Sequence, residues 1–60
     1  MSEKFSGKMV RELREAKGWT QGQLAAEVGI HASNISRIER GHNLPRVRLA
    51  ERIMEVLRYE

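Results

Sequence analysis

The sequence has 60 residues, which is enough for a single small domain, and it contains no cysteine, which excludes a disulfide scaffold and a cysteine metal site. Eleven Lys and Arg residues against eight Asp and Glu residues give a net charge of +3, which suits a polyanionic partner. Our domain prediction is therefore one domain over residues 1–60, with a basic surface.

Helical spacing of the apolar residues runs through the sequence, and no segment alternates in the manner of a β-strand. The places where a helix should end in a tight turn are marked by glycines, namely Gly18, Gly29 and Gly41. The first predicted helix covers about residues 5–17, with Ser2 or Ser6 in the N-cap position. We therefore expect an all-α fold of four helices.

The second and third predicted helices are short and are joined by a turn at Gly29. The second begins at Thr20, which matches a capping box together with Gln23 three residues later. The third covers about residues 32–40, with His31 in its N-cap position. Two short helices joined by a tight turn form a helix-turn-helix.

The fourth predicted helix covers about residues 46–58 and follows Pro45. Apolar residues fill about half of its circumference, which is wide for a helix that covers a small core. Leu49 and Val56 at the edge of this arc look surplus, and with Ile53 they are candidates for a dimer interface. The same arc could instead bind another protein. A membrane-surface role is a further alternative, which two glutamates on the polar face weaken.

The outward face of the third predicted helix has mostly short side chains and carries little charge. It consists of Ala32, Ser33, Asn34, Ser36 and Arg37. Small residues let a helix approach the base edges in the major groove, hydroxyl and amide groups can donate and accept hydrogen bonds, and an arginine can bond guanine O6 and N7 together. We interpret this face as a DNA base-reading surface, and the alternative is a plain solvated face.

The spacing of these residues matches a known family. The matching positions are Leu13-Arg14, Gly18, Thr20-Gln21, Leu24-Ala25, Val28-Gly29-Ile30, Ile35-Ser36 and Ile38-Glu39-Arg40-Gly41. Over about residues 6–57, the sequence resembles the lambda-repressor/Cro-like (XRE-type) DNA-binding domain. The resemblance implies a compact four-helix bundle with its helix-turn-helix at about residues 20–40, without the family's usual fifth helix. It also implies a bacterial or phage transcriptional regulator, acting as a repressor and a homodimer on a double-stranded DNA operator.

The resemblance further implies roles for individual residues. Gln21, at the start of the second helix, is expected to contact a backbone phosphate. Further candidates for phosphate contacts are His31, Asn43 and Arg46. Arg14 and Glu39 match a pair that forms a salt bridge between the first and third helices in similar proteins.

The sequence predicts neither an enzyme nor a cofactor, metal or small-molecule site. His31, Glu39 and His42 are titratable, but no paired carboxylates, activated nucleophile or phosphate-cradling loop accompany them. No apolar run approaches the roughly 20 residues of a membrane span, and the first eight residues lack the apolar segment of a signal peptide. We expect a cytoplasmic DNA-binding protein, with a protein-binding adaptor or antitoxin-like module as the alternative.

Overall fold

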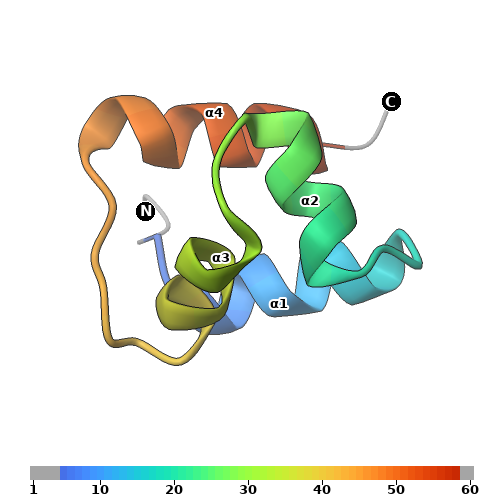
Figure 1. The fold of residues 1–60 in the computed structure, drawn as a ribbon, viewed down its shortest axis with the longest axis horizontal. Helices are drawn as coiled ribbons and strands as arrows, with labels where there is room; N and C mark the ends of the chain where they lie inside the picture. The colour runs from blue at the N-terminus through green and yellow to red at the C-terminus, as the bar shows by residue number, and fades with distance from the viewer. Residues whose placement is uncertain (1–4, 59–60) are drawn as a thin grey trace, which may run out of the picture.

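The computed structural model of the protein describes residues 5–58, and it contains four helices in that range (Figure 1). They are α1 (Gly7–Ala16), α2 (Gln21–Val28), α3 (Ala32–Glu39) and α4 (Val47–Leu57). No strand occurs within residues 5–58, so the all-α prediction is confirmed. The predicted ranges of the first and fourth helices were slightly too long at both ends.

The predicted caps explain where α1 and α2 begin. Ser6 is the N-cap of α1, and its Oγ accepts a hydrogen bond from the Met9 amide at 3.1 Å; the alternative cap, Ser2, lies outside the described residues. Thr20 and Gln23 form a complete capping box at α2, with hydrogen bonds of 3.0 and 2.7 Å. Each cap stabilises its helix by about 1 kcal/mol, because it satisfies amide groups that the first turn leaves unpaired.

The hydrophobic core lies between all four helices. Its buried members are Val10, Leu24, Ala25, Val28, Ile35, Ile38, Ile53 and Leu57. α2 packs against α3 and α4, and α1 packs against the same two helices. Figure 1 shows α4 along the top of the view, α1 and α3 in its lower part, and α2 on the right between the two levels. Each fully buried aliphatic side chain contributes about 1.5–3 kcal/mol, which is opposed by the conformational entropy of the chain.

Gly7, the first residue of α1, allows α1 to approach the end of α3 closely. A Cβ atom at this position would collide with the backbone oxygen of Ile38 and would lie only 2.9 Å from the backbone oxygen of Glu39. Backbone oxygens at a helix end cannot move aside as the tip of a flexible side chain can. The sequence pattern does not mark Gly7, because the restriction comes from a helix more than 30 residues away in the chain.

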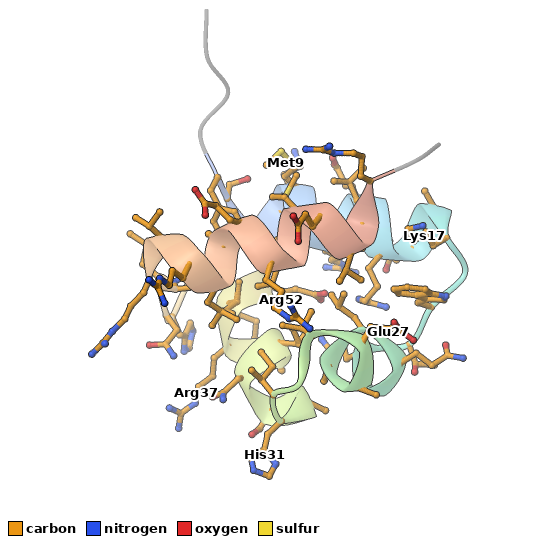
Figure 2. The ribbon with its side chains drawn as sticks, turned by 90° about the horizontal axis from the view of Figure 1, so that it is seen from above. Met9, Lys17, Glu27, His31, Arg37 and Arg52 are labelled. Atoms are coloured by element: carbon orange, nitrogen blue, oxygen red, sulfur yellow. The ribbon has the colours of Figure 1, made fainter. Side chains whose placement is uncertain are left out.

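Arg52 connects α4 to the end of α2. Its Nε donates a hydrogen bond to the backbone oxygen of Val28 at 3.1 Å, and Figure 2 shows Arg52 lying between α4 and the other helices. The last carbonyl groups of a helix have no partner within the helix, so an arginine from a neighbouring element can satisfy one of them. α4 is thereby tied to the turn that precedes α3.

Candidate nucleic-acid interface

The unit formed by α2, the turn and α3 is fixed by its backbone and by the core. Gly29 has φ of +91°, in the left-handed region where glycine is favoured, and its amide donates to the Ala25 oxygen at 2.7 Å. The amide of Ile30 donates to the same oxygen at 3.0 Å. Ile35 and Ile38 are buried against α1 and α2. One side of α3 therefore faces inward and the opposite side is presented to the surroundings.

The five predicted base-reading residues lie along α3, and their exposure differs. Ala32, Ser33 and Arg37 are exposed, whereas Asn34 and Ser36 are half-buried. Within residues 5–58, none of their side chains makes a hydrogen bond or ion pair with the rest of the chain. Figure 2 shows Arg37 extending from α3 away from the body of the molecule. The polar groups of this surface are consequently available to an external partner.

Three of the four predicted phosphate-contacting residues are exposed around this surface. His31 is the N-cap residue of α3, but its side chain makes no capping hydrogen bond; Asn43 and Arg46 lie in the segment that leads into α4. Gln21 is half-buried, and its Nε2 donates to Glu39 Oε1 at 3.0 Å. One amide hydrogen of Gln21 is thus engaged within the protein.

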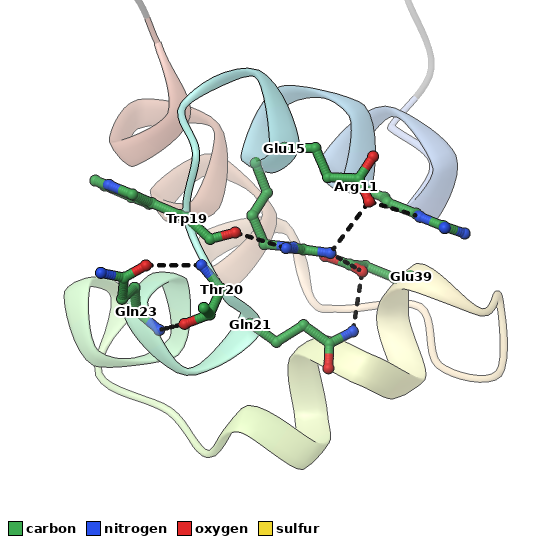
Figure 3. A network of polar contacts seen from close by, with 8 residues as sticks. Arg11, Glu15, Trp19, Thr20, Gln21, Gln23 and Glu39 are labelled. Carbon is green, nitrogen blue, oxygen red and sulfur yellow. Dashed lines mark hydrogen bonds and ion pairs between the residues drawn. The ribbon is translucent and has the colours of Figure 1, made fainter.

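Arg14 and Glu39 form a buried, two-point ion pair between α1 and α3 (Figure 3). Arg14 Nε lies 2.6 Å from Glu39 Oε2, and Arg14 Nη2 lies 3.1 Å from Glu39 Oε1. The two side chains are only 11% and 4% exposed. Arg14 Nη1 also donates to the backbone oxygen of Trp19 at 2.7 Å, which ties the α1–α2 connection to the same pair. With Gln21 as the second partner of Glu39, this network fixes α3 relative to α1 and α2.

The pKa of Glu39 is lowered by this network. Burial by itself would raise the pKa of the carboxyl group, because it disfavours the charged form. Hydrogen bonds from Arg14 and Gln21, together with the positive charges of Arg14 and Arg11, outweigh the burial and bring the pKa below its ordinary value of 4.5. The carboxylate is therefore charged at neutral pH and holds the guanidinium of Arg14 in place.

The three predicted dimer-interface residues of α4 pack in or against the core of the single chain. Ile53 is fully buried in the single chain, so it offers no surface to a second copy in this arrangement, and its role in a dimer stays a prediction. Leu49 and Val56 are half-buried and pack against the core, so they are less surplus than helical spacing indicated. The large exposed hydrophobic side chains of the described residues are instead Leu44 and Val47.

Among residues 5–58, no group of three or more His, Cys, Asp or Glu side chains could hold a metal ion. None of the helices described is long and apolar enough to cross a membrane. A shallow hollow beside α4 is lined by Phe5, Ala50, Glu51, Met54, Glu55 and Arg58.

The sequence is similar to known proteins over nearly its whole length. A family model described as helix-turn-helix (HTH_3) matches residues 10–60. The chain is 38% identical over 55 residues to the HTH-type transcriptional regulator SlrR of Bacillus subtilis (strain 168), which covers 90% of this chain and 36% of SlrR. It is 35% identical over 57 residues to the uncharacterized HTH-type transcriptional regulator YazB of the same organism, which covers 95% of this chain and 83% of YazB. No solved structure matches the sequence.

Proposed function

The chain belongs to the HTH_3 family of XRE-type helix-turn-helix domains, and we propose that it is a sequence-specific regulator of transcription that binds double-stranded DNA. In this proposal α3 enters the major groove of an operator, and two copies occupy the two halves of a two-fold site. Occupation of the operator represses transcription by keeping other proteins from that DNA. The names of SlrR and YazB as transcriptional regulators support the same general role here.

The observation that carries this proposal is the outward face of α3. The major groove of B-DNA is about 12 Å wide and admits one helix. The small side chains of Ala32 and Ser33 allow the backbone of α3 to come close to the base edges. The side-chain groups of Asn34, Ser36 and Arg37 make no hydrogen bond or ion pair within the described chain, so DNA would not have to displace an internal partner.

The surroundings of α3 support contacts with the DNA backbone. His31, Asn43 and Arg46 are exposed and can donate hydrogen bonds to phosphate oxygens. At the N-terminus of α2 the capping box satisfies the amides of Thr20 and Gln23, while the positive end of the helix dipole and the amides between them favour an anion. Gln21 at this end has one amide hydrogen engaged by Glu39, so its remaining hydrogen is held in a defined direction for a phosphate.

Selection from a random pool of DNA duplexes at about physiological salt tests the proposal. We expect enrichment of a two-fold sequence whose half-sites lie about one helical turn, roughly 34 Å, apart. Circular dichroism of the same preparation establishes that the chain is folded. A folded chain that enriches no sequence would contradict sequence-specific DNA binding.

Arg37→Ala tests whether the face of α3 reads bases. We expect it to weaken binding to the selected site by about 1–3 kcal/mol and to relax the preference at one base position, since an arginine can bond two atoms of a guanine. Arg58→Ala, which removes the same charge from the exposed C-cap of α4, is the matched control. Equal losses on selected and random DNA would assign Arg37 to the DNA backbone instead.

A second candidate function is a protein-binding adaptor or antitoxin-like module. The observation that favours it is the shallow hollow beside α4, which Phe5, Ala50 and Met54 line with apolar surface. Met54→Lys places a charge in the hollow and tests whether the hollow takes part in DNA binding. Unchanged selection of DNA by this variant would separate the hollow from DNA binding, as we expect from its position away from α3.

A further inference from the structure

His31 is an exposed titratable side chain at the edge of the proposed DNA surface. It occupies the N-cap of α3, where Ser, Thr, Asp and Asn are the usual residues, yet its ring makes no capping hydrogen bond. Within residues 5–58, no hydrogen bond or ion pair joins the ring to the rest of the chain. Figure 2 shows His31 and Arg37 both extending from α3 away from the body of the molecule. Protonation of the ring would therefore break no internal contact.

Few fixed charges surround the ring of His31. On the outward face of α3, the charged side chain is Arg37. The charged residue of α2 is Glu27, which is exposed, and Arg52 of α4 is engaged by the backbone oxygen of Val28. α1 meets the opposite end of α3, where the buried ion pair lies. A proton on His31 would consequently add a second positive charge beside that of Arg37 on a surface with little charge of its own.

A phosphate group favours the protonated form of any histidine beside it. The imidazole ring of histidine ordinarily has a pKa of about 6.5, so it is mostly neutral above neutral pH. An opposite charge within about 4–6 Å favours the charged form and raises this pKa, by roughly 1 or more for a close pair. A histidine that contacts a phosphate therefore takes up a proton on binding. By linkage, the affinity rises as the pH falls through the pKa of the bound form, and the gain is complete below the pKa of the free form.

We propose that His31 couples DNA binding to protonation, an inference that rests on the proposed function. The ring binds a backbone phosphate as an imidazolium, so the chain holds its operator more tightly in mildly acidic than in mildly alkaline conditions. The proton comes from the solvent and goes to the unprotonated nitrogen of the ring. The sequence's other histidine, His42, lies between Arg40 and Arg46 in the chain, where positive charges disfavour a further one.

The test measures the affinity for a duplex with one selected half-site at several pH values and constant ionic strength. We expect the affinity to rise about five- to tenfold from about pH 8 to about pH 6. Glu39 stays charged in this range, because its pKa lies below 4.5, and circular dichroism at each pH establishes that the chain is folded.

Three variants assign the proton to one ring. His31→Gln cannot titrate, and it should bind with the weaker affinity at every pH. His31→Arg carries a permanent positive charge, and it should bind with the tighter affinity at every pH. His42→Gln is the matched control and should keep the pH dependence of the wild type.

The salt dependence of binding provides a second readout. Each cation that neutralises a phosphate steepens the slope of log affinity against log salt by about 0.9. The slope of the wild type should therefore be steeper at about pH 6 than at about pH 8, by up to about 0.9. The slope of His31→Gln should be the same at both pH values.

The possible contrary results have separate meanings. A wild-type affinity that does not change with pH, or a pH dependence that persists in His31→Gln, would contradict the inference while leaving sequence-specific binding intact. A pH dependence lost in His42→Gln alone would assign the proton to the other histidine and would contradict it as well. No selection of any sequence by the folded chain would instead contradict the proposed function, and this inference with it.

Discussion

At the scale of single residues, the resemblance anticipated the pairing of Arg14 with Glu39, but not the network around it. The residue types at positions 14 and 39 match the family pattern, and the structure brings their charged groups to 2.6 Å. Two further contacts, from Gln21 to Glu39 and from Arg14 to the Trp19 oxygen, complete the site. Every residue carries a backbone oxygen, so the residue types give no sign of the contact between Arg14 and the Trp19 oxygen.

Glu39→Gln should destabilise the fold by about 3 kcal/mol at pH 7, because it leaves the buried guanidinium of Arg14 without a countercharge. This is a large part of the roughly 3–9 kcal/mol expected for a chain of this size. Urea denaturation followed by circular dichroism measures the loss. Glu27→Gln makes the same change at an exposed position of α2, and we expect it to alter stability by no more than about 0.5 kcal/mol.

The contribution of Glu39 should also depend on pH. Its pKa in the folded state lies below the ordinary value of 4.5, so the stabilisation is complete above about pH 4.5 and is lost as the pH falls through the folded-state pKa. The difference in unfolding free energy between the wild type and Glu39→Gln should therefore shrink on acidification. A difference that stays constant down to roughly pH 3 would show that the charge of Glu39 does not stabilise the fold.

At the scale of helices, the spacing of apolar residues, together with capping residues, turn glycines and Pro45, predicted all four elements. Ser6, the Thr20 and Gln23 pair, and Gly29 act locally, and local signals survive in the sequence. What the sequence did not reveal was how the helices approach each other. The close approach at Gly7 and the hydrogen bond from Arg52 to α2 both join segments that are distant in the chain. Neither contact produces a periodic pattern, because each involves one residue.

Replacing Gly7 and Gly22 by alanine should change stability in opposite directions. Gly7→Ala should cost about 1–3 kcal/mol, because its Cβ collides with the backbone at the end of α3. Gly22→Ala should stabilise the fold by up to about 1 kcal/mol, because alanine favours the helix and the nearest atom, Thr20 Oγ1, is 3.8 Å from the new Cβ. Thermal unfolding should show the two midpoints on opposite sides of the wild type. A rise with Gly7→Ala would mean that α1 and α3 are farther apart than the structure shows.

At the scale of the whole molecule, helical periodicity located the core and the outward face of α3 but misjudged the free apolar surface. The wide arc of α4 was expected to leave Leu49 and Val56 in excess, yet both pack against the core. The exposed residues, Leu44 and Val47, lie where the chain enters α4, and their exposure depends on the path of a connecting segment. Periodicity describes regular helices well, but it carries no information about that path.

The distribution of charge over the molecule leads to a prediction about salt. If Arg46 contacts a phosphate, it releases a condensed counterion on binding, so Arg46→Ala should weaken binding to all sequences alike and reduce the slope of log affinity against log salt by about 1. Arg58→Ala removes an equal charge at the far end of α4 and should leave the slope unchanged, because salt screens charges that are distant from the duplex. Titrations of a random-sequence duplex at several salt concentrations measure both slopes. If the two variants reduced the slope equally, the effect would follow net charge, and Arg46 would have no direct contact with the DNA backbone.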